Sequence, residues 1–403
     1  MLLARHYEMQ IRDREDVDVD TLAKAIDLYR QATEADPESA LAFSRLAGTL
    51  LYLGDMEQAE APIFKAMSLD PDLSEVQHTM GLYYWARGRP EALEAFQRAV
   101  ELNPNNADAL QYYAMSYWLG YDRAGRPDLL RRAVAADPLT LSRHAALADY
   151  LAKDGHADDA AEAVEQIREI FVDGQSDKKV EAYRVIDVVL SQIGRLDEAI
   201  AWTIKARDQE PDNPDHVQRL AELYAIIGDF DTALRLEPEP GLGILFHMRD
   251  YPTLIDDAEF LMLEEPGDIL VRYLLAFGHT AVGNNEDALR ILRTTGQPGV
   301  MLNDTPRIAA DVEATYTFAN ATYAYGDVET AATLAERISS PNRGTGVVWW
   351  YDFHRSCGLA IMGREDEAID ALQKIERSPQ LPWEPYVRDS VCMKLLEDRP
   401  EYQ

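Results

Sequence analysis

The sequence predicts an all-α fold, a solenoid of stacked antiparallel helix pairs, and two observations support this. The first is a sequence motif that recurs at 54–71, 88–104 and 194–211. It consists of a glycine, an alanine four or five residues later and a proline further on. The second is the helical spacing of the apolar residues on both sides of each glycine. A period of about 34 residues is typical of small repeats that pack only on their neighbours.

The repeat that begins at Ala40 shows both helices of a pair. Its first helix has an apolar face at i, i+3, i+4 and i+7, formed by Phe43, Leu46, Ala47 and Leu50. Gly54 ends this helix, and Asp55 can cap the next one. The second helix carries a narrower stripe, formed by Ala59, Ile63 and Ala66. Pro71 ends the repeat, and the small alanines let the two helices approach closely.

The same pattern continues along the chain, with departures. Residues 21–37 fit the second half of an earlier repeat, and six clear repeats reach residue 236, with Arg126 in place of a small residue in the third. The segment 237–243, Glu-Pro-Glu-Pro-Gly-Leu-Gly, cannot continue a helix because of its prolines and glycines. A short repeat at 244–266 follows. Three later turns keep the glycine–alanine pair, namely Gly283/Ala288, Gly326/Ala331 and Gly363/Ala368.

These departures divide the chain into four parts. We predict a regular array over 1–236, a Pro/Gly break at 237–243, a degenerate array over 244–378, and a C-terminal capping helix and tail over 379–403. The end helix is expected at 386–396, where its polar face would close the last repeat of the solenoid.

The repeat resembles the tetratricopeptide repeat, which places a large residue, Leu-Gly, an aromatic, then alanine, an aromatic and proline at fixed offsets. The second repeat matches this pattern with Met80-Gly81, Tyr84, Gly88, Ala92, Phe96, Ala99 and Pro104. The resemblance covers nearly the whole chain and is strongest over 20–236. It implies a right-handed superhelix of about ten to eleven repeats, in which the first helix of each repeat lines a concave groove.

The resemblance also implies which residues face this groove. The predicted partner-binding residues are His78, Leu82, Trp85, Gln111, Met115, Trp118, Arg184, Tyr273, Phe277, Tyr316, Asn320, Tyr323, Trp350 and Phe353. Aromatic side chains anchor peptides at little entropy cost, so we expect the groove to hold an extended peptide or a partner helix. Trp85 and Trp118 lie one repeat apart, as adjacent positions on one surface would. Packing between repeats is the alternative role for both.

One activity of the family can be compared directly. Members that hold the C-terminal carboxylate of chaperones use lysines and asparagines at groove positions. The corresponding residues here are His78, Leu82, Gln111 and Met115. Because this clamp is absent, we do not expect a co-chaperone role.

The sequence carries no pattern of catalytic or metal-binding chemistry. The eight histidines form no His-Glu-x-x-His motif, and there is no Cys-x-x-Cys. The segment Asp16-x-Asp18-x-Asp20 imitates a calcium loop, but Thr21 stands where its turn glycine belongs. We therefore expect no enzyme activity, no metal and no cofactor.

The charge of the chain bears on its partners. Its 403 residues carry a formal net charge of −32, from 39 Lys and Arg against 71 Asp and Glu. Such a field repels nucleic acids and anionic membranes, so we expect a protein or peptide partner and no nucleic acid. Solubility is the simplest explanation of the charge, and a basic partner is the alternative. No stretch approaches the roughly 18 consecutive apolar residues of a membrane span, so no membrane insertion is expected.

The cysteines bear on the compartment. Cys357 and Cys392 are too few for a disulfide framework and fit a reducing cytosol. The first residues turn polar too soon for a signal peptide. We expect a cytoplasmic protein, with its oligomeric state left open.

A non-catalytic scaffold for protein–protein interaction is the leading hypothesis. The alternative is a sensory or regulatory module of a larger bacterial signalling protein. It rests on the opening Leu3-Ala-Arg-His-Tyr-Glu and the closing Leu395-Leu-Glu-Asp-Arg-Pro-Glu-Tyr-Gln, which resemble the repeat regions of bacterial nucleotide cyclases and winged-helix transcription regulators. An unrecognised enzyme is the third class, and it lacks converging catalytic groups.

Overall fold

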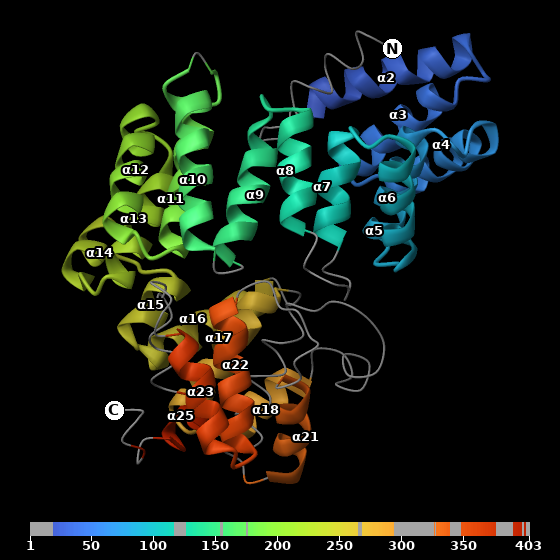
Figure 1. Cartoon of the computed structure of the whole chain (residues 1–403). Helices are drawn as coiled ribbons and strands as arrows, with labels where there is room; N and C mark the ends of the chain where they lie inside the picture. Colours follow the sequence, from blue (N-terminus) through green and yellow to red (C-terminus); the bar gives the residue numbers. More distant parts are fainter. Residues whose placement is uncertain are drawn as a thin grey trace. The chain divides into compact units, whose positions relative to one another are not determined.

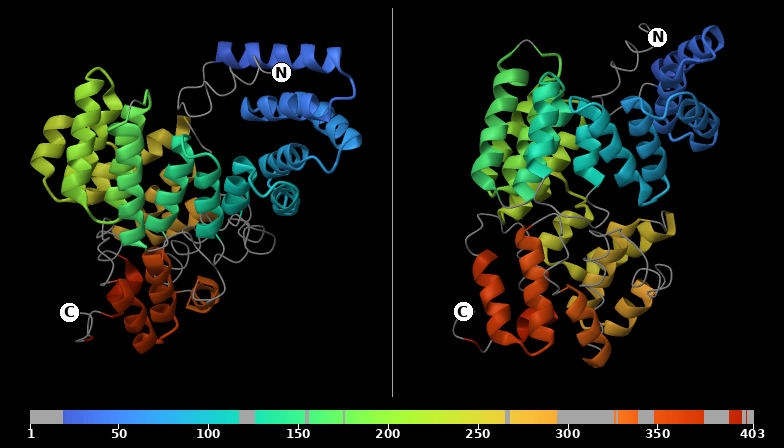
Figure 2. Two further views of the ribbon diagram at one scale, coloured as in Figure 1. Left: turned by 45° about the horizontal axis from the view of Figure 1, so that its top comes forward. Right: turned by 45° about the vertical axis from the view of Figure 1, so that its right-hand side comes forward.

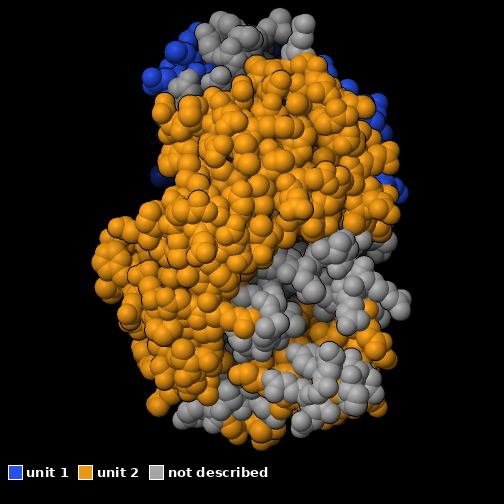
Figure 3. Space-filling model, turned by 90° about the vertical axis from the view of Figure 1, so that its left-hand side faces the viewer, with its two compact units in different colours: residues 1–147 blue, residues 148–403 orange. Residues whose placement is uncertain are grey.

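The described part of the chain consists of helices joined by turns and short loops. The computed structural model describes residues 19–116, 126–153, 156–174, 176–264, 268–293, 326, 328–338, 348–375, 390–396 and 399. These residues form helices and no strand (Figure 1). The all-α prediction is confirmed, and the number of repeats stays a prediction. The chain divides into two compact units, Met1–Leu147 and Ala148–Gln403, here called unit 1 and unit 2 (Figure 3).

Unit 1 is a series of helix pairs. Its helices are α2 (Val19–Ala35), α3 (Ala40–Tyr52), α4 (Met56–Leu69), α5 (Ser74–Ala86), α6 (Glu91–Leu102), α7 (Ala107–Ser116), α8 (Arg126–Ala136) and the start of α9 (Leu141–Lys153). Helix α3 packs on α4, α5 on α6 and α7 on α8. The first helices of neighbouring pairs also meet, α3 with α5 and α5 with α7, so they follow one another along the unit (Figure 2).

Unit 2 continues with pairs of less regular length. Its helices are α10 (Ala157–Ile167), the π-helix η2 (Arg168–Val172), α11 (Lys179–Gln192), α12 (Leu196–Gln209), α13 (Pro214–Ile226), α14 (Phe230–Leu236), α15 (Leu242–Met248), α16 (Tyr251–Glu264), α17 (Ile269–Ala281), α18 (Asn285–Arg293), α21 (Val328–Ile338), α22 (Val348–Ile361), α23 (Glu365–Ile375) and α25 (Val391–Lys394). Helix α14 ends at Leu236 and α15 begins at Leu242, so the helical structure is interrupted within the predicted break. The predicted domain boundary at this break stays a prediction.

The recurring glycine is the turn between the two helices of a pair. Seven glycines at turns between described helices have positive φ, namely Gly54, Gly88, Gly194, Gly228, Gly283, Gly326 and Gly363. At Gly54 φ is 82°, a left-handed conformation that suits glycine because it has no Cβ. The next N–H, of Asp55, donates to Leu50 O at 2.9 Å, and the Asp55 side chain caps α4 by accepting from Gln58 N–H at 3.0 Å.

The two helices of a pair approach closely where the pattern places a small residue. Gly81 of α5 faces the ring of Phe96 of α6, and a Cβ at Gly81 would lie 2.5 Å from that ring. The Phe96 side chain is fully buried. The ring therefore occupies the space that a side chain at residue 81 would need.

We expect Gly81→Ala to lower the free energy of unfolding by about 1–3 kcal/mol, because the new methyl overpacks against Phe96. Gly48→Ala is the matched control. It also lies inside a helix, but its Cβ would meet Thr79 at 3.7 Å, an ordinary contact, so alanine should gain up to about 1 kcal/mol of helix propensity. Urea denaturation of both variants checks this, and equal effects would contradict the packing argument.

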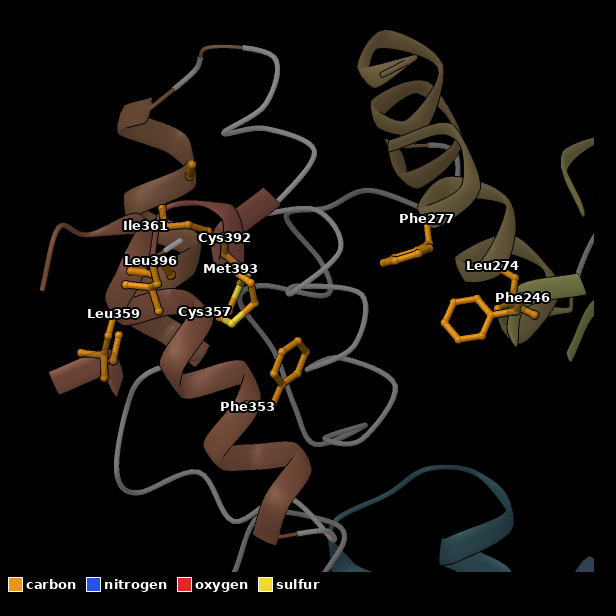
Figure 4. Close-up of a cluster of buried hydrophobic side chains, with 14 of the residues drawn as sticks. Phe246, Leu274, Phe277, Phe353, Cys357, Leu359, Ile361, Cys392, Met393 and Leu396 are labelled. Carbon is orange, nitrogen blue, oxygen red and sulfur yellow. A yellow bond between two sulfur atoms is a disulfide. The ribbon is translucent and has the colours of Figure 1, made fainter. Parts of the chain in front are cut away.

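The cysteines correct the expectation from the sequence. Cys357 of α22 and Cys392 of α25 form a disulfide across 35 residues of sequence, and both side chains are fully buried (Figure 4). Met393 and Leu396 enter the same apolar cluster. The expectation of two reduced cysteines is thus not met, because the chain end folds back onto α22 and brings the two sulfur atoms together.

Residues near the C-terminus contact α22 and α23, and the C-terminal capping helix stays a prediction. Arg399 donates to Glu365 at 3.1 Å and to Asp366 at 2.6 Å, both in the first turn of α23. Of the helix predicted at 386–396, the structure describes 390–396, where the α-helical residues are those of α25, and 376–389 lie outside the described residues.

Reduction of the Cys357–Cys392 bond should lower the free energy of unfolding by about 3–4 kcal/mol, because the bond closes a loop of this length in the unfolded chain. Urea denaturation with and without dithiothreitol measures the effect. The double variant Cys357→Ala/Cys392→Ala is the control and should not respond to the reductant. An unchanged urea midpoint for the unsubstituted chain on reduction would contradict the bond.

Candidate functional site

The first helices of unit 1 enclose a groove with a volume of about 790 Å³. Its walls come from α3, α5 and α7, with the first turn of α9 at one end. Four of the predicted partner-binding residues line it, namely His78, Leu82, Trp85 and Gln111. The structure therefore brings together, in one hollow, residues that the repeat pattern placed on two neighbouring helices. Binding by these residues stays a prediction.

Trp85 is held in place by other aromatic rings. Its ring meets the rings of Phe96 and Tyr112 at centroid distances of 5.8 Å and 5.6 Å, both edge to face. Phe96 and Tyr112 stack on each other at 5.7 Å, and His78 meets Tyr112 at 5.5 Å. Trp85 is half-buried and also lines the groove, so the two roles considered for it, packing and groove, coexist. A ring fixed in this way loses little further entropy when a ligand covers it.

A buried arginine closes the end of the groove. Arg143, in the first turn of α9, is only 3% exposed. Its guanidinium donates to Asp108 at 2.9 Å, to Asp137 at 2.9 and 3.1 Å, and to Gln111 Oε1 at 3.0 Å. Two carboxylates compensate its charge, as burial of an arginine requires. The sequence pattern did not single out Arg143.

Polar side chains also link neighbouring helix pairs. Ser44 and Thr79 share a hydrogen bond at 2.9 Å, and Asn106 Nδ2 donates to Ser74 Oγ at 2.8 Å. The partners are 35 and 32 residues apart, about one repeat. These bonds fix the first helices relative to one another along the groove.

In unit 2, charged side chains about one repeat apart also form hydrogen bonds between neighbouring helix pairs. Arg219 of α13 donates to Asp187 of α11 at 3.0 Å, and the two residues are 32 apart. Burial raises the pKa of Asp187, and the hydrogen bond from Arg219 opposes that rise. Asp187 stands where the repeat pattern normally packs a small residue, so Arg219 compensates a carboxylate in the interior.

Three of the predicted residues are buried in unit 2 and cannot contact a partner. Tyr273 and Phe277 of α17 are 2% and 4% exposed, and Phe353 of α22 is 0% exposed. Other helices cover both of these first helices, since α17 meets α15, α16 and α18, and α22 meets α21, α23 and α25. The groove assignment for these three side chains is corrected to core.

The other predicted residues lie elsewhere. Met115 of α7 and Arg184 of α11 are half-buried, and neither lines the groove of unit 1. Trp350 belongs to α22, but its side chain is not among those described. Trp118, Tyr316, Asn320 and Tyr323 lie outside the described residues.

The described part of the chain holds neither a metal-binding cluster nor a helix that could cross a membrane. No three or more His, Cys, Asp or Glu side chains gather there in a way that could hold a metal ion. No helix there has both the length and the apolar character needed to cross a membrane.

Comparison with curated proteins supports the tetratricopeptide resemblance. No family model matches the chain. A stretch of 105 residues, 26% of the chain, is 28% identical to the small glutamine-rich tetratricopeptide repeat-containing protein 2 of Mycosarcoma maydis. The chain spans only 30% of the length of that relative. The resemblance of the chain termini to cyclases and transcription regulators stays a prediction.

Solved structures with a similar arrangement include YrrB, described as a tetratricopeptide repeat protein with an unusual peptide-binding site. It is 22% identical, with a TM-score of 0.33, over 46% of this chain and 93% of that one. A monomeric mutant of IFIT1 with Gppp-AAAA is 15% identical, with a TM-score of 0.46, over 93% of this chain and 89% of that one. The human IFIT1 dimer with PPP-AAAA is 16% identical, with a TM-score of 0.42 and the same coverage.

The expectation of no nucleic acid partner is contradicted by the IFIT1 structures. They hold Gppp-AAAA and PPP-AAAA on chains that align with 93% of this one. Net charge describes the whole surface, whereas binding is decided by the residues of one local site. The exclusion drawn from net charge is therefore withdrawn.

Arg143→Met should lower the free energy of unfolding by about 1–3 kcal/mol, because it removes the hydrogen bonds of a buried guanidinium to Gln111 and to the partly exposed Asp108 and Asp137. Arg98→Met is the matched control. Arg98 also contacts two carboxylates, but its side chain is 47% exposed, so its removal should change stability little. Urea denaturation compares the two, and an equally small loss for Arg143→Met would contradict the buried network.

Proposed function

We propose that the chain is a non-catalytic scaffold for protein–protein interaction and that the groove of unit 1 binds a peptide segment or a partner helix. The observation that carries this proposal is the groove itself, in which Trp85 is exposed on one side and held by Phe96 and Tyr112 on the other. A fixed, half-exposed tryptophan beside Leu82 offers a large apolar area to an incoming side chain.

The polar part of the groove favours a peptide. Hydroxyl and amide side chains line it, together with the acidic residues Glu75, Asp108 and Asp137 and the basic residues Arg45 and Arg143. Asp108 and Asp137 are engaged with Arg143, so that its positive charge is compensated. A peptide needs apolar contact and hydrogen bonds to its backbone, and this lining offers both.

The regulatory alternative is compatible with the same groove. It adds an effector domain outside this sequence and rests on the two chain ends, most of which lie outside the described residues. In that case the groove would report a bound partner to the effector.

The compartment can be decided by the cysteine pair. The proposal of a cytoplasmic protein predicts that Cys357 and Cys392 are reduced in cells, because glutathione keeps cytosolic thiols reduced. The bonded pair in the structure is the state expected of an oxidising compartment. Alkylation of thiols in intact cells before lysis, followed by mass spectrometry, distinguishes the two.

We expect Trp85→Ala to weaken peptide binding by about 10–30-fold, as loss of a central aromatic anchor does. The probe is the tightest peptide selected from a displayed library of random twelve-residue sequences, with affinity measured by fluorescence anisotropy. Tyr84→Ala is the matched control, because Tyr84 is also a half-buried aromatic of α5 but does not line the groove.

Two results would contradict the proposal. One is that no peptide is selected, or that the selected peptide binds Trp85→Ala as tightly as the unsubstituted chain while circular dichroism is unchanged. The other is that a 5′-triphosphorylated tetra-adenylate displaces the peptide at lower concentration than the unlabelled peptide does.

A further inference from the structure

The Gln111 amide has a fixed orientation at the groove wall. Its Oε1 accepts from Arg143 Nη1 at 3.0 Å. A guanidinium can only donate hydrogen bonds, so a flipped amide would set two donors against each other. The oxygen must therefore face Arg143. The amide nitrogen, with its two N–H donors, is then turned away from the guanidinium.

The Arg143 guanidinium cannot shift together with the Gln111 side chain, because it also donates hydrogen bonds to two carboxylates. Asp108 of α7 and Asp137, between α8 and α9, both accept from its guanidinium at 2.9 Å. With 3% of its surface exposed, the side chain has little room for another rotamer. Arg143 is thus a positioning residue for the Gln111 amide.

The Gln111 nitrogen is available to a ligand. Within the described part of the chain Gln111 Nε2 donates no hydrogen bond, and Gln111 lines the groove. By contrast, the amide of Asn106 is used on both sides, since its nitrogen donates to Ser74 and its oxygen accepts from Ala109 N–H. The groove therefore presents a directed N–H donor at Gln111, on the helix next to that of Trp85.

We propose that Gln111 Nε2 donates to a backbone carbonyl oxygen of the bound segment, and that the groove therefore selects an extended peptide over a partner helix. This rests on the proposed function. In an α-helix the carbonyls are occupied by the i→i−4 bonds, except in the last turn. An extended chain offers a carbonyl at every residue while its side chains alternate in direction, so one side chain can lie against Trp85 as a carbonyl meets Gln111.

The test is a double-mutant cycle that combines a substitution at Gln111 with amide-to-ester replacements in the peptide backbone. Each amide of the selected twelve-residue peptide is replaced in turn by an ester, whose carbonyl is a weaker acceptor. Each ester peptide is measured against the unsubstituted chain and Gln111→Glu, which keeps an oxygen toward Arg143 but has no N–H. One ester should cost about 3–10-fold in affinity on the unsubstituted chain and less than twofold on Gln111→Glu.

Two further variants complete the design. Gln77→Glu adds the same charge on α5 outside the groove and should keep the full ester effect. Arg143→Lys keeps a positive charge beside Asp108 and Asp137 but lacks the planar fork that reaches Gln111, so the ester effect should fall below twofold while circular dichroism is unchanged.

The outcomes separate this inference from the proposed function. If the peptide binds and depends on Trp85, but no ester effect is lost in Gln111→Glu, the carbonyl contact is overturned and the proposed function stands. If the selected peptides become helical on binding, as measured by circular dichroism, selection of an extended segment is overturned. If no peptide binds, or if Trp85→Ala leaves the affinity unchanged, the proposed function and the Gln111 contact are both overturned.

Discussion

The left-handed turn at the repeat glycine is the constraint on which the rest of the structure depends. A glycine such as Gly54 reverses the chain within a few residues, so the next helix must run back along the previous one. In unit 1 the first helices of successive pairs therefore meet, α3 with α5 and α5 with α7, although a second helix lies between them in the chain. In unit 1 the outcome is that α3, α5 and α7 share one surface, and the groove is that surface. The close contact of Gly81 with Phe96 then sets how near the second helix can lie.

Contacts one repeat apart turn this stack into a rigid site. Backbone turns alone leave the angle between successive pairs free to vary, whereas Ser44–Thr79, Ser74–Asn106 and the Arg143 network join each pair to the next. The groove is therefore organised before a ligand arrives, which reduces the entropy cost of binding. The same rigidity gives Gln111 a defined donor direction.

The local parts of this structure could be predicted from the sequence, and the non-local parts could not. Helix pairs, turn glycines and the Asp55 cap follow from residues within one repeat, so the pattern was sufficient. His78, Leu82, Trp85 and Gln111 were placed in the groove because unit 1 keeps regular repeats. Tyr273, Phe277 and Phe353 were misplaced because helices of the irregular repeats cover α17 and α22 on several sides. The Cys357–Cys392 bond and the Arg143 network depend on residues about one repeat apart, and a search for complementary pairs at that spacing would have found Arg143 with Asp108.

The central claim is that the stacked first helices of unit 1 form the binding surface. Hydrogen–deuterium exchange of the intact chain, with and without a saturating selected peptide, tests it most directly, because the peptide should slow exchange where it covers and stabilises the backbone. We predict added protection in α5, α7 and the first turn of α9, with α4, α6 and all of unit 2 unchanged. Protection confined to α17 and α22, or to the second helices α4 and α6, would contradict the account.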